Sequence, residues 1–245
     1  CGSLTINSGA TLDTSGSDLA LTVTGQTTID TDGVLICNDS AITLGSGVTA
    51  TWGLQINGGS GSAGGLFTGG GGTHIMGSLN LQNTSPPYAT ATLSSGTTTI
   101  NSENTASNAC FVNGDNAVLN HGSGEVIITT PTASILECRN DSLNDLTIND
   151  SSAVISIYDP GGGGDGPSGQ SLRVAGDLDI AAGELTTAAY ADDDWGLVVD
   201  GDVTVTGTLD GGSANVTLGS LTIESGGTYN ATSGTTTITD YTTTG

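Results

Sequence analysis

The chain has 245 residues, of which 40 are glycine, 35% are hydrophobic and 11% are charged, and its formal net charge at pH 7 is −23. Lysine is absent, and Arg139 and Arg173 are the only arginines. This charge repels phosphate backbones and anionic lipid surfaces, so we expect no binding of nucleic acid. No stretch is long and apolar enough for a membrane span, so we also expect no membrane insertion. Disorder is disfavoured, because the hydrophobic residues lie in short alternating runs.

One short phrase with two parts recurs along the chain. The first part is G-S-L at the start of an expected strand, and the second part is G-x-T-T-I. The pairs occupy residues 2–6 with 25–29, 77–81 with 96–100, and 219–223 with 234–238. The separation between the two halves becomes shorter from the first pair to the third. Short recurring strands with connections of variable length are typical of stacked repeat proteins.

Between these phrases the dominant pattern is alternation of apolar and polar residues. It is clearest at residues 19–25, 125–130, 197–209 and 215–223. Strict alternation predicts strands with one buried face. Turns rich in glycine, asparagine and aspartate separate these runs, and a helical period is nearly absent.

Two glycine-rich segments, residues 57–72 and 159–169, interrupt the pattern and are expected to be loops. The recurring phrase stands on both sides of each segment. We therefore predict a single domain over residues 1–245, with loop breaks at these two places. The chain opens on Cys1 and not on methionine, so we expect it to be part of a longer or processed polypeptide.

Many short strands at close spacing admit a β-sandwich, an antiparallel barrel or a parallel β-helix. Repeats of about 16 to 25 residues with two or three strands fit one coil of a solenoid. The prediction is an all-β, right-handed parallel β-helix of about ten coils, with β-sandwich repeats as the alternative.

Residues 197–238, and residues 2–16 with them, resemble the repeats of filamentous-haemagglutinin-like adhesins and autotransporter passenger domains. They are also similar to the Thr/Gly/Asn-rich β-solenoid modules of phage tail spikes and virion appendages. The resemblance covers about half of the chain and lies in composition and period. It implies a right-handed β-helix that is exported to a cell or virion surface. It carries over no functional residue.

Calcium is the metal that the composition favours, because it takes carboxylate and carbonyl oxygens from Gly/Asp turns. The candidate ligands are Asp159 and Asp165 in the second glycine-rich segment, and Asp192, Asp193 and Asp194 further on. The alternative for both groups is a solvated acidic loop. No other cofactor is expected.

Trp195 follows the second acidic group directly. A carboxylate cluster beside an aromatic platform resembles a sugar site, which makes Trp195 a candidate for glycan contact. The alternative is an acidic turn whose tryptophan folds back onto the body of the protein.

Cys110 and Cys138 are separated by about one long coil. Neighbouring coils lie about 4.8 Å apart, within the range that a disulfide can bridge. The two residues are therefore disulfide candidates between coils, and otherwise buried small apolar residues.

The sequence does not point to an enzyme. Two arginines and no lysine disfavour an enzyme acting on polyanions, and His74 and His121 lack metal-ligand spacing. We expect a non-enzymatic, structural, extracellular β-solenoid, as a segment of a surface adhesin, a filament, or a virion fibre or decoration. The expected partners are copies of itself or neighbouring subunits, and host-surface glycans. The alternative function is a carbohydrate-binding or carbohydrate-cleaving β-helix protein.

Overall fold

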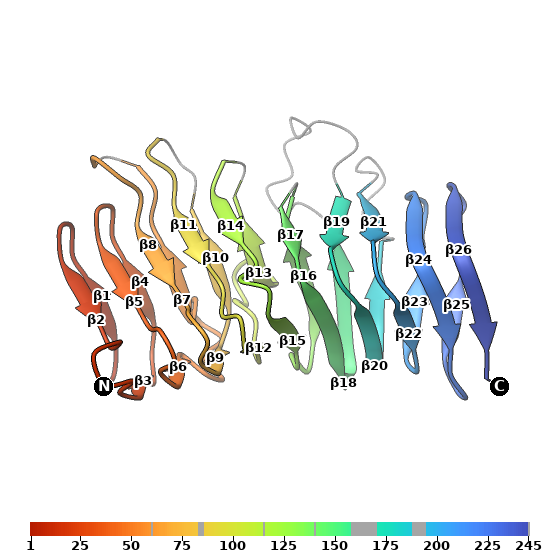
Figure 1. Ribbon diagram of the computed structural model, residues 1–245, viewed down its shortest axis with the longest axis horizontal. Helices are drawn as coiled ribbons and strands as arrows, with labels where there is room; N and C mark the ends of the chain where they lie inside the picture. The colour runs from red at the N-terminus through yellow and green to blue at the C-terminus, as the bar shows by residue number, and fades with distance from the viewer. Residues whose placement is uncertain are drawn as a thin grey trace.

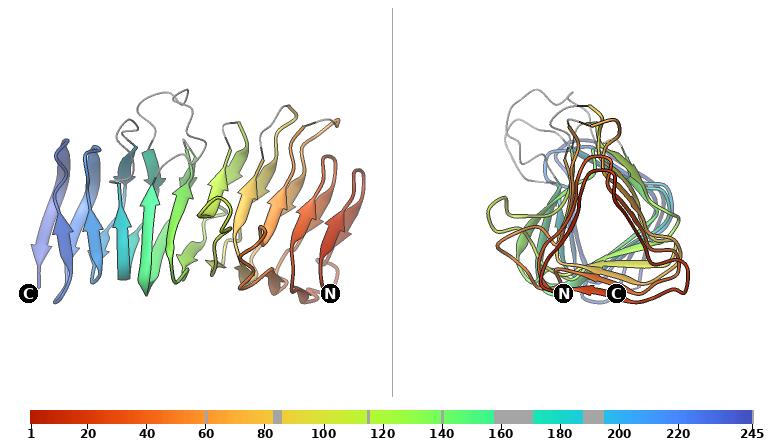
Figure 2. Two further views of the ribbon diagram at one scale, coloured as in Figure 1. Left: turned by 180° about the vertical axis from the view of Figure 1, so that it is seen from behind. Right: turned by 90° about the vertical axis from the view of Figure 1, so that its left-hand side faces the viewer.

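The structure, a computed structural model, describes residues 1–59, 61–82, 86–114, 116–139, 141–157, 171–187 and 195–244. These residues form an elongated coil of short strands (Figure 1) with a three-sided cross-section (Figure 2). Every ladder between two of the described strands is parallel. The predicted parallel β-helix is confirmed, and the β-sandwich alternative is wrong. The described part of the chain contains no helix of the length and apolarity that a membrane crossing requires.

In each coil the chain passes through three faces, which we call A, B and C in chain order. Face A has ten rungs: β1 (Leu4–Ile6), β4 (Thr27–Ile29), β7 (Leu54–Ile56), β10 (Leu79–Leu81), β13 (Ala109–Asn113), β16 (Ala133–Glu137), the second halves of β18 (Asp145–Ile157) and β20 (Leu178–Thr186), β23 (Thr208–Asp210) and β25 (Thr228–Asn230).

Face B also has ten rungs. They are β2 (Thr11–Asp13), β5 (Val34–Ile36), β8 (Leu66–Thr68), β11 (Thr90–Thr92), β14 (Val118–Asn120), β17 (Ser142–Leu143), β19 (Ser171–Val174), β21 (Gly196–Val199) and the first halves of β24 (Val216–Ile223) and β26 (Thr236–Thr243). The first five form a sheet of their own.

Face C completes each coil. Its rungs are β3 (Leu21–Val23), β6 (Ile42–Leu44), β9 (His74–Met76), β12 (Thr97–Ile100), β15 (Glu125–Ile128), the first halves of β18 and β20, β22 (Val203–Val205), and the second halves of β24 and β26. Ten rungs on each face agree with the predicted number of coils.

The coils differ in length although their strands stay in register. Leu4 pairs with Thr27 in the next coil, whereas Leu79 pairs with Phe111, which is a clearly longer step along the chain. Some coils are thus longer than the repeats in the sequence predicted. The additional residues lie at the corners between faces, where a longer connection leaves the ladders unchanged.

The recurring phrase marks strand starts and not one position in the coil. Residues 2–6, 25–29 and 77–81 lie on face A, residues 96–100 and 219–223 on face C, and residues 234–238 on face B. Its glycine has a steric role at the corner. A Cβ at Gly25 would lie 2.5 Å from the Gly2 carbonyl oxygen, and one at Gly219 would lie 2.5 Å from that of Asp200. The glycine of the phrase therefore allows the backbone of one coil to pack closely against the backbone of the preceding coil.

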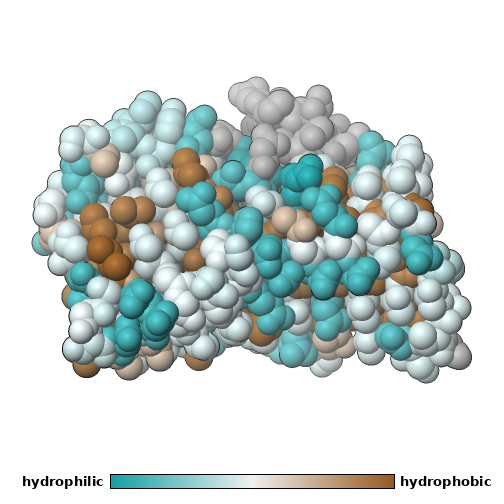
Figure 3. Space-filling view, viewed as in Figure 1, coloured by the Kyte–Doolittle hydropathy of each residue, from teal (hydrophilic) through white to brown (hydrophobic). Residues whose placement is uncertain are grey.

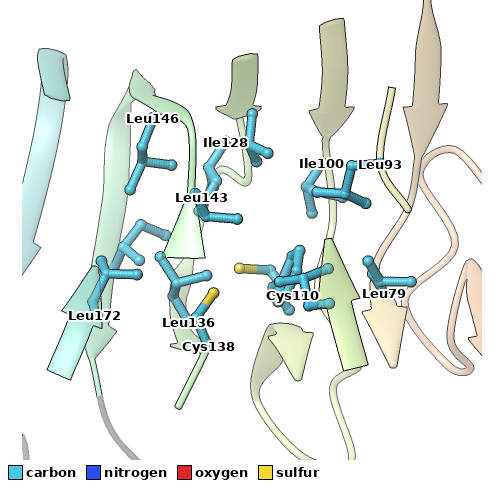
Figure 4. Close-up of a cluster of buried hydrophobic side chains, with 14 of the residues drawn as sticks. Leu79, Leu93, Ile100, Cys110, Ile128, Leu136, Cys138, Leu143, Leu146 and Leu172 are labelled. Carbon is cyan, nitrogen blue, oxygen red and sulfur yellow. The ribbon is translucent and has the colours of Figure 1, made fainter. Parts of the chain in front are cut away.

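The interior is filled by stacked aliphatic side chains. On face C, one column of paired positions is buried at each of eight successive rungs: Val23, Leu44, Met76, Ile100, Ile128, Ile148, Ile180 and Val205. Figure 4 shows the central part of this interior, with leucine and isoleucine side chains directed inward from facing strands. Parallel pairing in register keeps like residues in contact from coil to coil, which buries apolar surface along the whole rod.

The expected loop at residues 57–72 contains a strand. Phe67, at the centre of β8, is fully buried and pairs with Leu35 before it and Ala91 after it. The prediction of a continuous loop was therefore wrong at residues 66–68, because one aromatic side chain on the interior column outweighs its glycine-rich surroundings. The other expected loop, residues 159–169, lies outside the described residues.

Most of the surface on the side that Figure 3 shows has intermediate hydropathy, with separate hydrophilic and apolar areas. This agrees with the alternation in the sequence, since most strands turn apolar residues inward and polar residues outward, although Thr27 and Thr98 are buried and Val118 is exposed.

Candidate functional site

The predicted calcium ligands lie outside the described part of the chain. This holds for Asp159 and Asp165 and for Asp192, Asp193 and Asp194. Both calcium sites stay predictions. Among the residues that the structure describes, no three histidine, cysteine, aspartate or glutamate side chains come together as a metal site.

Trp195 is placed in the interior, with 4% of its surface exposed. The guanidinium carbon of Arg139 lies 6.0 Å from its ring centroid. Arg139 Nε is 2.5 Å from Glu137 Oε1, and Glu137 is also buried. Trp195 is therefore buried beside Arg139. Its contact with glycans stays a prediction, with a tryptophan folded onto the rod as the alternative.

Cys110 and Cys138 lie on neighbouring coils, as expected, in or next to the paired strands β13 and β16. Both are fully buried and both thiols are free. Burial raises the pKa of Cys110 to about 12 and the pKa of Cys138 well above its ordinary value. Figure 4 shows both sulfur atoms in the same part of the interior. The structure places the pair together without a bond between them, and the disulfide stays a prediction.

His74 lies within the apolar interior. It takes the place of an aliphatic residue in a face C column, between Ile42 and Thr98. Its side chain is fully buried and meets Phe67 edge to face, with ring centroids 5.7 Å apart. Neither ring nitrogen has a hydrogen-bond partner among the described residues. Burial lowers the pKa of His74 to about 4, with the nearby backbone of Gly69 opposing the shift.

This burial predicts a pH-dependent stability. The pKa of His74 is lower in the folded chain than the ordinary 6.5, so its contribution is complete above pH 6.5 and is lost as the pH falls towards 4. The loss amounts to about 3 kcal/mol, since each pKa unit corresponds to about 1.4 kcal/mol. In His74→Leu this part of the pH dependence is expected to vanish, and stability at pH 7 should rise by about 1–3 kcal/mol because two unpaired nitrogens are removed.

The measurement is urea unfolding at pH 7 and pH 4.5 for both proteins, so that the carboxylates common to both cancel. His121→Gln, at the chain's other histidine, is the control and should keep the wild-type dependence. An unchanged pH dependence in His74→Leu would contradict this assignment.

A polar row that the sequence analysis did not identify runs along the corner between faces A and B, the upper edge in Figure 1. In each of the first four coils the residue after the face A strand is polar, namely Asn7, Asp30, Asn57 and Gln82. Their backbones continue the ladder. Asp30 N donates to Ile6 O at 2.9 Å, and Gln82 N donates to Ile56 O at 2.9 Å. The four side chains are therefore stacked, one coil above the next.

A directed chain of hydrogen bonds leads into this row from the outer side of face A. Gln26 Nε2 donates to Gln55 Oε1 at 3.0 Å, and Gln55 Nε2 donates to Asn57 Oδ1 at 2.8 Å. Asn57 Nδ2 then donates to Asp30 Oδ1 at 3.0 Å. Each amide thus has its orientation set by its neighbour, and the chain ends on a carboxylate.

The row borders a surface cavity of about 310 Å³, lined by Ser8, Asp30, Thr31, Asn57, Gly58 and Gln82. These residues come from four successive coils. Gly58 is required at the wall, because a Cβ there would lie 2.7 Å from the carbonyl oxygen of Gln82.

Two aspartates at this corner have different roles. Asp32 accepts hydrogen bonds from Ser62 Oγ at 2.7 Å and from Ala63 N at 2.6 Å. These bonds lower the pKa of Asp32, and the bond from Ser62 has the largest effect. It therefore ties two coils together. The side chain of Asp30 accepts a hydrogen bond only at Oδ1 within the described residues, and Asp30 lines the cavity.

The sequence signal for this site is a polar residue directly after each of four strands. It can be recognised only when the register of the strands is known. The four row residues follow strands of ordinary appearance and are unevenly spaced along the chain, so no fixed period relates them.

No protein-family model matches this chain, and no curated protein and no solved structure matches it. The resemblance to adhesin and virion-appendage repeats thus extends to the β-solenoid architecture alone.

Proposed function

We propose that this chain is a non-enzymatic structural β-solenoid that serves as an extracellular rod, in a surface adhesin, a filament, or a virion fibre or decoration. The observation that supports this most directly is the stack of ten rungs on each of three faces around one aliphatic interior. Parallel ladders join these rungs within the described residues, except between β14 and β17 on face B. Such a stack transmits force along its axis, because backbone hydrogen bonds join every coil to the next. Its composition resembles that of exported β-helix repeats in adhesins and virion appendages.

The partners in this proposal are neighbouring subunits or copies of the chain. They would contact the faces of the rod, and the corner loops would contact other surfaces.

The location can be tested with antibodies raised against the purified chain. Applied to intact producer cells or particles, they are expected to label the outer surface, with an antibody to a cytosolic protein as the negative control. Labelling that requires lysis would contradict an extracellular role.

Carbohydrate binding or cleavage is the second candidate function, and the polar cavity at the corner of faces A and B is the observation that favours it. Cleavage can be separated from binding by incubating the chain with neutral polysaccharides and measuring new reducing ends. The proposed structural role predicts no release above that of heat-denatured protein, and sustained release would replace it with an enzymatic one.

A further inference from the structure

We propose that the cavity lined by Asp30, Asn57 and Gln82 is a binding site for a neutral saccharide. The inference rests on the second candidate function, carbohydrate binding, and specifies its site and ligand class. It does not depend on the structural role.

The cavity offers several polar groups that are available to a ligand. Asn57 uses one N–H of its amide on Asp30, which leaves the second N–H. Asp30 keeps one carboxylate oxygen, and the side-chain amide of Gln82 makes no hydrogen bond within the described residues. A carboxylate acceptor beside amide donors and acceptors can hydrogen-bond two neighbouring hydroxyl groups of one sugar ring.

The polar side chains of the cavity are held in place before a ligand binds. The side chains of Gln26 and Gln55 hold Asn57 in one orientation, and Asn57 in turn holds Asp30. Groups that are already fixed lose little conformational entropy on binding, so more of the hydrogen-bond energy appears as affinity. Hydrogen-bonded amides on strand ends are also placed more accurately than side chains on a free loop.

The charge of the cavity and of the whole chain favours a neutral ligand. Asp30 is the only charged residue of the described lining, and the whole chain has a net charge of −23. A uronic acid, a sulfated sugar or a phosphate would be repelled. A neutral sugar carries hydroxyl groups that pair with a carboxylate without this penalty.

The size of the cavity limits the ligand. About 310 Å³ lies at the lower end of the range of small-molecule sites and suits one or two sugar rings. The described lining contains no aromatic residue, so binding rests on hydrogen bonds, and we expect a Kd on the order of 1 mM. Many copies on one surface would raise the apparent affinity.

The test is titration of the ¹⁵N-labelled chain with the methyl glycosides of glucose, galactose, mannose and N-acetylglucosamine, and with methyl glucuronide as the anionic comparison. The signals followed are the side-chain amides of Asn57 and Gln82. At least one neutral glycoside is expected to shift them saturably, and methyl glucuronide at least tenfold more weakly.

Two variants locate the site. Gln82→Ala removes a side chain whose amide makes no hydrogen bond within the described residues, and Asp30→Asn removes the carboxylate; each should weaken binding at least fivefold. Asp240→Asn, the same chemical change on the last coil, should bind as the wild type does. Thermal melts followed by circular dichroism establish that each variant is folded, and Gln82→Ala is the decisive one because it leaves the hydrogen-bond chain intact. Absence of saturable shifts, equal binding of the glucuronide, or wild-type affinity in folded Gln82→Ala would overturn the inference.

Discussion

Replacing Phe67 by alanine is expected to lower the free energy of unfolding by about 3–5 kcal/mol. Phe67 is fully buried, lies in the interior column between Leu35 and Ala91, and supports the ring of His74. Its removal leaves a cavity that the neighbouring coils cannot close, because their backbones are held in register on both sides. The loss therefore includes the transfer of the ring to water and the contacts of the cavity wall.

Urea unfolding followed by circular dichroism measures this effect. Tyr241→Ala is the matched control, since Tyr241 is an aromatic residue with 55% of its surface exposed on the last coil. It should change stability by less than about 1 kcal/mol. A Phe67→Ala protein as stable as Tyr241→Ala would show that β8 does not contribute to the interior in solution.

Replacing Arg139 by alanine is expected to cost about 3–5 kcal/mol, because it leaves the buried carboxylate of Glu137 without the cation that faces it. Glu137 is 1% exposed and Arg139 is 9% exposed. The substitution also uncovers one side of Trp195, over whose ring the guanidinium lies. Tryptophan fluorescence should therefore shift to longer wavelength in the native state.

The chain offers a close control at its other arginine. Arg173 Nη2 lies 3.4 Å from Asp200 Oδ2, with both side chains about half exposed. An exposed pair of this kind contributes about 0–1 kcal/mol, so Arg173→Ala should be nearly neutral. Equal losses in the two variants would contradict the burial of the Glu137–Arg139 pair.

Much of the architecture could be predicted from local patterns. Alternation over a few residues at a time predicted the strands, since side chains on successive strand residues point to opposite sides. The run from residue 203 to 209 illustrates this, with Val203, Val205 and Leu209 buried as expected. Recurrent strand starts predicted stacking, because a short strand with one apolar face has to bury that face against another.

Local patterns did not predict the neighbours of residues whose surroundings come from other coils. Phe67 stands among glycines and belongs to the interior only because Leu35 and Ala91 lie directly above and below it. Trp195 was a candidate for glycan contact, with a tryptophan folded onto the rod as the alternative, and it lies beside Arg139, which stands far earlier in the chain. Neither neighbourhood has a local signature.

The residues of the candidate site also could not be identified from local sequence patterns. Asn57 and Gln82 have no distinctive sequence context. Strand pairing alone places Asn57 beside Asp30 and Gln82 beside Asn57. Coil lengths vary, as the short step from Thr208 to Thr228 and the long step from Leu79 to Phe111 show. A residue's distance along the chain therefore does not indicate which residue lies beneath it.

By itself, the sequence determined that this protein consists of short, one-sided strands that stack, and that its surface is strongly acidic. These properties follow from alternation, glycine placement and composition, which act over a few residues. Only the tertiary structure decided which strands share a face, that identical phrases lie on different faces, and that polar residues from four coils line one cavity. The physical reason is that register in a parallel β-helix is set by backbone pairing between coils, and the corners absorb any difference in chain length.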